Sequence, residues 1–136
     1  FCNGRILMQL RDFKPGIAHS GCWGYFGGSI HEGETPDRAA QRELKEEIGF
    51  YPHSLICLGR MPIVDMNNLI AYTFTCSLPI PLDRLTLTEG VEMALATPEE
   101  IRSKRIFSKS LKRFCPVAPL SYINEALTLT LASHQL

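Results

Sequence analysis

The chain has 136 residues, of which 45% are hydrophobic and 21% charged, and its 14 basic residues balance its 14 acidic residues. This length and apolar content are enough for a sizeable core, and we expect one domain spanning residues 1–136, with its N-terminal strand truncated. The neutral balance argues against a nucleic-acid partner, because coating nucleic acid requires a basic surface. No apolar run approaches the length of a membrane span, so no membrane partner is expected either.

The use of cysteine points to a reducing compartment. The five cysteines are an odd number and include no C-x-x-C pair, which disfavours both a disulfide scaffold and a structural zinc site. We therefore expect a cytoplasmic protein. The oligomeric state is open, and a homodimer is one alternative.

Six segments have the composition of β-strands. They are rich in β-branched and aromatic residues or short apolar runs, and turn residues bound them. Between the first two lies a turn-rich loop at 13–22, and residues 65–68 are expected to connect two strands as a hairpin. The expected strands are 5–12, 23–30, 54–60, 62–65, 69–77 and 90–96.

Three segments have helix signals. The expected helices are 36–48, 97–104 and 121–132. The second begins with Thr97 as its N-cap and Pro98 at its first helical position. Helices distributed among strands in this order predict an α/β fold with a mixed β-sheet between helices.

The helix at 36–48 has clear boundaries. Thr35 is a favourable N-cap, Pro36 suits the first helical position, and Gly49 is a natural left-handed residue after the last turn. At about 100° per residue, the helix carries one apolar stripe. The stripe consists of Ala40, Leu44 and Ile48.

Three carboxylates form a neighbouring stripe on this helix. Glu43, Glu46 and Glu47 are spaced at i, i+3 and i+4, so their side chains can converge. Like charges at this spacing cost a few tenths of a kcal/mol, and the last helical turn favours cations over anions. Several unfavourable placements of acidic residues in one short segment, together with Glu34 at the start of the helix, are typical of a functional site. All-oxygen ligands favour Mg²⁺, with Mn²⁺ as a substitute.

Residues 28–50 resemble the signature of a known family. They match the Nudix box, G-x5-E-x7-R-E-U-x-E-E-x-G-U with U apolar, at every specified position from Gly28 to Phe50. The chain is thereby identified as a member of the Nudix (MutT-like) hydrolase family. The resemblance implies an α/β/α sandwich. Phe26 stands where many Nudix proteins have proline, which affects the shape of the loop.

The resemblance also implies roles for the residues of the box. Glu43, Glu46 and Glu47 match the metal ligands, and the carbonyl of Gly28 often joins them. Glu43, or a carboxylate further along the chain, matches the group that activates water. Arg42 and Glu34 match a pair that orients the acidic cluster, which suits the planar, bidentate guanidinium of arginine.

Outside the box, four residues are candidates for the site. Nudix proteins often carry a further glutamate near residues 89–92, and Glu89 is preferred to Glu92 because it lies beside Gly90. Tyr25 and Phe26 offer aromatic faces that suit a nucleobase, although each also suits the core. Arg11, at a strand end, is the best candidate for contact with a phosphate.

The resemblance implies Mg²⁺-dependent hydrolysis of a phosphoanhydride in a nucleoside diphosphate linked to another group. The expected substrate is a small nucleotide, either a nucleoside triphosphate or a nucleotide sugar. Two alternatives stay open. One is an isomerase of the isopentenyl-diphosphate type, which shares the fold, and the other is a non-catalytic nucleotide-binding module.

Overall fold

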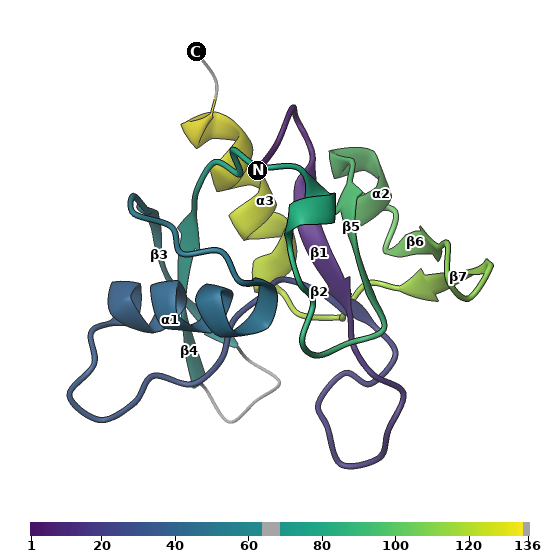
Figure 1. Ribbon diagram of the computed structural model, residues 1–136, viewed down its shortest axis with the longest axis horizontal. Helices are drawn as coiled ribbons and strands as arrows, with labels where there is room; N and C mark the ends of the chain where they lie inside the picture. The colour runs from purple at the N-terminus through teal and green to yellow at the C-terminus, as the bar shows by residue number, and fades with distance from the viewer. Residues whose placement is uncertain (64–68, 135–136) are drawn as a thin grey trace.

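The chain forms small antiparallel sheets flanked by helices, seen in a computed structural model that describes residues 1–63 and 69–134 (Figure 1). The strands are β1 (Ile6–Leu10), β2 (Trp23–Gly24), β3 (Ile56–Ile63), β4 (Leu69–Thr75), β5 (Glu92–Ala96), β6 (Arg105–Ser108) and β7 (Arg113–Pro116). The helices are α1 (Pro36–Ile48), α2 (Pro98–Arg102) and α3 (Tyr122–Ser133), with a 3₁₀ turn η1 (Leu82–Arg84). In the described part of the chain, no helix is long and apolar enough to cross a bilayer.

The strands pair in three separate sheets. β1 lies between β2 and β5, β3 pairs with β4, and β6 pairs with β7, all antiparallel. A parallel bridge joins Trp23 to Val117. The sequence predicted one mixed sheet, whereas the described strands form smaller antiparallel ones. Two of these sheets, β3–β4 and β6–β7, pair strands that are neighbours in the chain, whereas β1 pairs with the distant β5.

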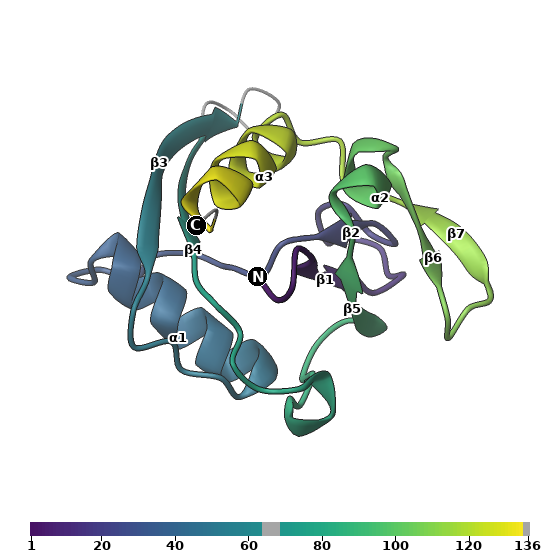
Figure 2. The same ribbon diagram turned by 90° about the horizontal axis from the view of Figure 1, so that it is seen from above.

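The helices cover the strands from two sides, as an α/β/α sandwich requires. Figure 2 shows the β3–β4 hairpin between α1 and α3. Helix α1 packs against β4, and α3 packs against β3, β4 and α2. The expected α/β class and the three expected helices are confirmed.

The main core forms around β1 and α3. Met8, Leu10 and Trp23 are fully buried, and they pack with Ile123 and Leu127 of α3. The Trp23 indole N–H is also satisfied, since it donates a 3.0 Å hydrogen bond to a backbone carbonyl of β6. A second cluster joins the end of α1 to the segment after β4. Its buried members are Ile48, Leu78 and Leu85.

Helix α1 buries more than its apolar stripe. Of the expected stripe, Ile48 is fully buried, while Leu44 and Ala40 are only half-buried. The helix instead buries Ala39 and the carboxylate-bearing Glu47. The core therefore meets α1 across a wide arc that includes one of the acidic residues.

Three strand predictions need correction. The strand expected at 23–30 is confined to Trp23–Gly24, and the strands expected at 54–60 and 62–65 are replaced, within the described residues, by the single strand Ile56–Ile63 with a bulge between Cys57 and Gly59. The β6–β7 hairpin was missed, because its short basic strands lack a strong apolar pattern. The hairpin connection expected at 65–68 lies outside the described residues.

A single carboxylate holds the turn of the β6–β7 hairpin. Glu92 of β5 accepts hydrogen bonds from the hydroxyls of Ser108 and Ser110, the second at 2.7 Å. It also accepts from the backbone N–H groups of Lys109 and Ser110 at 3.3 Å. Burial alone would raise the pKa of Glu92, but these hydrogen bonds outweigh burial and hold the pKa below its ordinary value. Glu92 is therefore committed to the hairpin.

Replacing Glu92→Gln is expected to lower the free energy of unfolding by about 1.5–3 kcal/mol at neutral pH, because charge-assisted hydrogen bonds are lost. A carboxylate with a lowered folded pKa stabilises above its ordinary pKa, and this contribution disappears as the pH falls through the lowered value. Urea unfolding should therefore show the variant and the wild type converging in acid. The matched control is Glu99→Gln on α2, which is exposed. Equal stability of the two variants at neutral pH would contradict the anchoring role.

Candidate functional site

The Arg42 side chain organises the loop that precedes α1. Its Nε donates to Glu34 Oε2 at 2.7 Å and its Nη2 to Glu34 Oε1 at 3.0 Å, a bidentate pair. The same Nη2 donates to the Ser29 carbonyl at 2.8 Å. Glu34 Oε1 also accepts from the backbone N–H of His31 at 3.0 Å. One guanidinium therefore joins the helix to two points of the glycine-rich loop.

The remaining nitrogen of Arg42 faces the acidic stripe. Nη1 donates to Glu43 Oε1 at 3.0 Å and to Glu46 Oε2 at 3.3 Å. The Arg42 hydrogen bonds lower the pKa of Glu34 to about 2, and hydrogen bonding to Glu34 in turn raises the pKa of Arg42. Glu34 and Arg42 are therefore both charged at neutral pH.

Glu47 is the buried member of the stripe. Its side chain lies against the core, and its Oε1 has no hydrogen-bond partner among the described residues. Burial raises the pKa of Glu47, and the neighbouring carboxylates of Glu43 and Glu89 raise it further, while the backbone N–H of Gly27 opposes the shift. An isolated buried carboxylate is unfavourable, so this position calls for a positive charge.

The glycine-rich loop passes directly over Glu43. A Cβ atom built on Gly28 would overlap the Glu43 carboxylate. Only glycine leaves room for the carboxylate to lie against the loop backbone, which explains why the box requires glycine there.

A contact between distant segments places Glu89 beside the helix. The hydroxyl of Thr88 donates to the Glu46 carbonyl at 2.9 Å, and the Thr88 backbone N–H donates to the Glu47 carbonyl at 3.0 Å. These bonds satisfy carbonyls that the end of α1 leaves free. The next residue, Glu89, is exposed and close enough to Glu47 to raise its pKa. Sequence reasoning missed Thr88, because its partners lie about 40 positions away and no local pattern marks it.

The fit of a divalent cation can be tested on these side chains. Among the described residues, no three His, Cys, Asp or Glu side chains form a ready-made cluster, because Arg42 engages Glu43 and Glu46 and the Glu46 side chain is 59% exposed. The expected convergence of three carboxylates is therefore incomplete in this structure. The unpartnered Oε1 of Glu47, with Glu43 and Glu89 nearby, still supplies oxygen donors, and a cation there would stabilise the charged form of Glu47 that burial disfavours. Such donors fit a hard cation such as Mg²⁺, provided that Glu46 turns inward.

The expected substrate contacts lie outside this cluster or in the core. Arg11 Nε donates to the Ala18 carbonyl at 2.8 Å, within its own loop. The Tyr25 hydroxyl donates to the Ile123 carbonyl at 2.8 Å, and burial raises the Tyr25 pKa. Phe26 packs against the cluster of Ile48. Contact of Arg11, Tyr25 or Phe26 with substrate stays a prediction.

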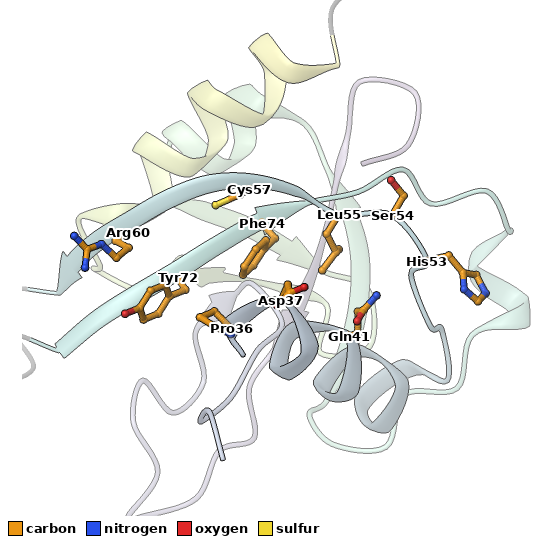
Figure 3. A pocket seen from close by; sticks show the side chains of 10 residues that line it. All are labelled: Pro36, Asp37, Gln41, His53, Ser54, Leu55, Cys57, Arg60, Tyr72 and Phe74. Carbon is orange, nitrogen blue, oxygen red and sulfur yellow. The ribbon is translucent and has the colours of Figure 1, made fainter. Parts of the chain in front are cut away.

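A groove of about 700 Å³ runs beside α1 and opens to solvent (Figure 3). Its walls come from the first half of α1, the segment before β3, and the faces of β3 and β4. The described lining residues are Pro36, Asp37, Gln41, His53, Ser54, Leu55, Cys57, Arg60, Tyr72 and Phe74. At 100° per residue, Gln41 and Glu43 point to opposite sides of the helix. The acidic stripe, and not this groove, therefore locates the candidate chemistry.

Together, the α/β/α arrangement and the acidic helix under a glycine-rich loop define a Nudix-type domain. The NUDIX domain family model matches residues 2–114, and the chain belongs to the Nudix family.

Curated relatives match over a shorter stretch. An RNA pyrophosphohydrolase from Acinetobacter baylyi is 44% identical over 50 residues, covering 37% of this chain and 26% of the relative. An oxidized purine nucleoside triphosphate hydrolase from Danio rerio is 40% identical over 58 residues, covering 43% of this chain and 35% of the relative. The matches thus span about a quarter to a third of these relatives' length.

Solved structures share the fold over most of the chain. A MutT protein from Methanosarcina mazei Go1 superimposes with a TM-score of 0.71 at 16% identity, covering 98% of this chain and 89% of that chain. The Nudix domain of Shewanella oneidensis NrtR, solved with ADP ribose, gives a TM-score of 0.69 at 14% identity, covering 96% and 78%. At this identity, the likeness shows the fold alone.

Adding Mg²⁺ or Mn²⁺ is expected to raise the melting temperature of the wild type, because a cation that binds only the native cluster stabilises by mass action. The gain should reach about 2.7 kcal/mol at a metal concentration of about 100 times Kd. In Glu47→Gln the gain should vanish, while the metal-free variant melts no lower than the wild type, since a neutral amide replaces a buried carboxyl group whose charged form is unfavourable there.

The matched control is Glu32→Gln, an exposed carboxylate in the neighbouring loop, which should keep the full gain. An identical metal-induced shift in Glu47→Gln and in the wild type would show that the cation binds elsewhere.

Proposed function

We propose that this chain is a divalent-cation-dependent hydrolase that cleaves a phosphoanhydride bond in a nucleoside diphosphate linked to another group. The supporting observation is the buried, unpartnered Oε1 of Glu47, with Glu43 and Glu89 beside it and Arg42 holding the cluster in place. Negative charge concentrated where the core should exclude it fits a cation site better than a structural role.

The residues that hold the cation are Glu43, Glu46 and Glu47, with the carbonyl of Gly28. When bound there, Mg²⁺ or Mn²⁺ supplies Lewis-acid neutralisation of phosphate oxygens. Glu47 is fixed by the core and supplies a rigid oxygen, whereas Glu46 is exposed and supplies an adjustable one.

A carboxylate of the site takes the proton of the attacking water. Glu89 and Glu43 are the two candidates. Glu89 is exposed at the end of a loop that Thr88 ties to α1, so its carboxylate is open to water. Glu43 is half-buried and its Oε1 already accepts a hydrogen bond from Arg42, which leaves this carboxylate less open to water and favours Glu89.

We favour a substrate that carries a nucleoside triphosphate group over a nucleotide sugar. The names of two relatives, RNA pyrophosphohydrolase and oxidized purine nucleoside triphosphate hydrolase, support this choice. The intact box disfavours a non-catalytic module.

Turnover of a nucleoside triphosphate with Mg²⁺ in ¹⁸O-labelled water is expected to give a nucleoside monophosphate and pyrophosphate, with the label on one of the two. Mass spectrometry of the products locates the attacked phosphorus. Glu46→Gln and Glu47→Gln should each reduce turnover at least about a hundredfold, because each removes a charged cation ligand. Glu125→Gln on α3 is the exposed control and should keep full activity.

Three results would contradict the proposal. One is label found only in inorganic phosphate, and another is efficient turnover of a simple phosphomonoester with nucleotides untouched. The third is full activity of Glu47→Gln at saturating Mg²⁺.

A further inference from the structure

The β6–β7 hairpin concentrates positive charge in a chain that is neutral overall. Residues 104–114 hold five of the 14 basic residues and no aspartate or glutamate. All five basic residues are exposed: Lys104, Arg105, Lys109, Lys112 and Arg113. Figures 1 and 2 both show the hairpin at the rim of the molecule, away from α1. Net charge therefore hides a strongly basic local surface.

Aromatic rings share the same outer face. Phe107 and Phe114 lie directly opposite each other across the two strands, with ring centroids 5.3 Å apart in an edge-on arrangement. They are 44% and 53% exposed, although large apolar side chains are usually buried. The Arg105 guanidinium lies 4.2 Å above the Phe114 ring. Cations and aromatic faces therefore alternate on this surface.

A second cation–ring contact lies on the other side of β7. The Arg113 guanidinium lies 5.2 Å from the ring of Phe13, which is 49% exposed, and Arg113 pairs with the buried Ser108 across the strands. The outer face therefore carries the contact of Arg105 with Phe114, and the contact of Arg113 lies on the side of the loop after β1. Contacts of this kind keep the rings and guanidinium planes at fixed separations, which reduces the entropy lost when a ligand binds.

The hairpin is held rigidly from its inner side. Ile106 and Cys115 are buried in the main core, and the carbonyl of Ile106 accepts the Trp23 hydrogen bond. At the turn, the oxygens of Glu92 are taken up by Ser108, Ser110 and two backbone N–H groups. The one acid beneath the hairpin is therefore engaged internally, and the outer face stays basic.

We propose that the outer face of the β6–β7 hairpin, formed by Arg105, Phe107 and Phe114 with Lys109 and Lys112 at the turn, binds single-stranded nucleic acid. A single strand offers what this face can recognise, since its bases stack on aromatic rings and its phosphates pair with arginine and lysine. Binding is independent of the proposed hydrolysis, because none of these residues belongs to the acidic cluster.

An anionic membrane is the competing partner, because it also attracts basic and apolar side chains. The positions of the side chains favour nucleic acid. The turn, which would enter a bilayer first, carries Lys109 and Lys112 beside one apolar residue, Leu111. The aromatic rings lie back on the strands, where they pair with each other and one of them lies beneath the Arg105 guanidinium.

The test measures fluorescence anisotropy of a labelled single-stranded oligonucleotide of about 12 nucleotides, a length within the usual site size. The oligonucleotide carries a 5′ hydroxyl and the buffer contains a chelator, so that neither a polyphosphate nor a metal contributes. The full chain is compared with a Phe107→Leu, Phe114→Leu double variant, which keeps the apolar volume and removes both π faces. A Lys109→Gln, Lys112→Gln double variant removes charge at the turn.

The leucine variant should bind at least about fivefold more weakly, because stacking is lost. The glutamine variant should bind more weakly and lower the slope of log affinity against log salt by about 1.4, about 0.7 for each phosphate contact on a single strand. Two control variants change exposed residues outside the hairpin. Tyr51→Leu removes an exposed aromatic ring, and Arg84→Gln removes an exposed basic side chain on η1. Both should bind the oligonucleotide like the wild type. Thermal melts confirm that each variant is folded.

Four outcomes would overturn the proposal. These are no binding by the wild type, equal affinity of the leucine variant and the wild type, and equal losses in the control variants. The fourth is binding to vesicles that contain anionic lipid but not to the oligonucleotide, with the same residues required, which would assign the face to a membrane.

Discussion

The candidate site depends on the guanidinium of Arg42. Four carboxyl or carbonyl groups, those of Glu34, Ser29, Glu43 and Glu46, converge on this one side chain. Without it, the glycine-rich loop would have no polar tie to α1 through Glu34 and Ser29, and Glu43 and Glu46 would repel each other without compensation. Only arginine has the planar, five-donor fork that can satisfy a bidentate carboxylate and further acceptors at once.

A second constraint follows from the burial of Glu47. The core meets α1 over a wide arc, so the acidic stripe is partly drawn out of water. A carboxylate in that position is unfavourable by itself, and the nearby charges of Glu43 and Glu89 make it more so. The rest of the fold stabilises the chain enough to tolerate this unfavourable burial. Local destabilisation of this kind is typical of a site that binds a ligand of opposite charge.

Local signals in the sequence were enough to predict much of this arrangement. The caps at Thr35, Pro36 and Gly49 predict α1, and Thr97 and Glu100 form the capping box that begins α2. The resemblance to the Nudix box implied that Arg42 and Glu34 form a pair, and these side chains lie 2.7 Å apart. These features are predictable because each depends on residues within about ten positions.

Features that depend on distant segments were not predictable. The tie from Thr88 to the end of α1 and the anchoring of the β6–β7 turn by Glu92 join residues far apart in the chain. The burial of Glu47 also depends on which elements pack against α1, and helical periodicity alone placed the apolar stripe on Ala40 and Leu44. The net charge of the chain did not predict the basic hairpin, because a sum over all residues does not show where the charges lie.

The central claim is that Arg42 shapes the acidic cluster into a divalent-cation site. The most direct measurement is the affinity for Mn²⁺, by titration calorimetry, of the wild type, Arg42→Lys and the exposed control Arg38→Lys on the same helix. Lysine keeps the charge but cannot hold Glu34 bidentately while reaching Glu43. The account predicts that Arg42→Lys binds Mn²⁺ at least about tenfold more weakly than the wild type, because the loss of a residue that orients metal ligands typically lowers metal affinity by this much. Arg38→Lys should bind Mn²⁺ like the wild type. A folded Arg42→Lys variant with wild-type affinity would contradict it.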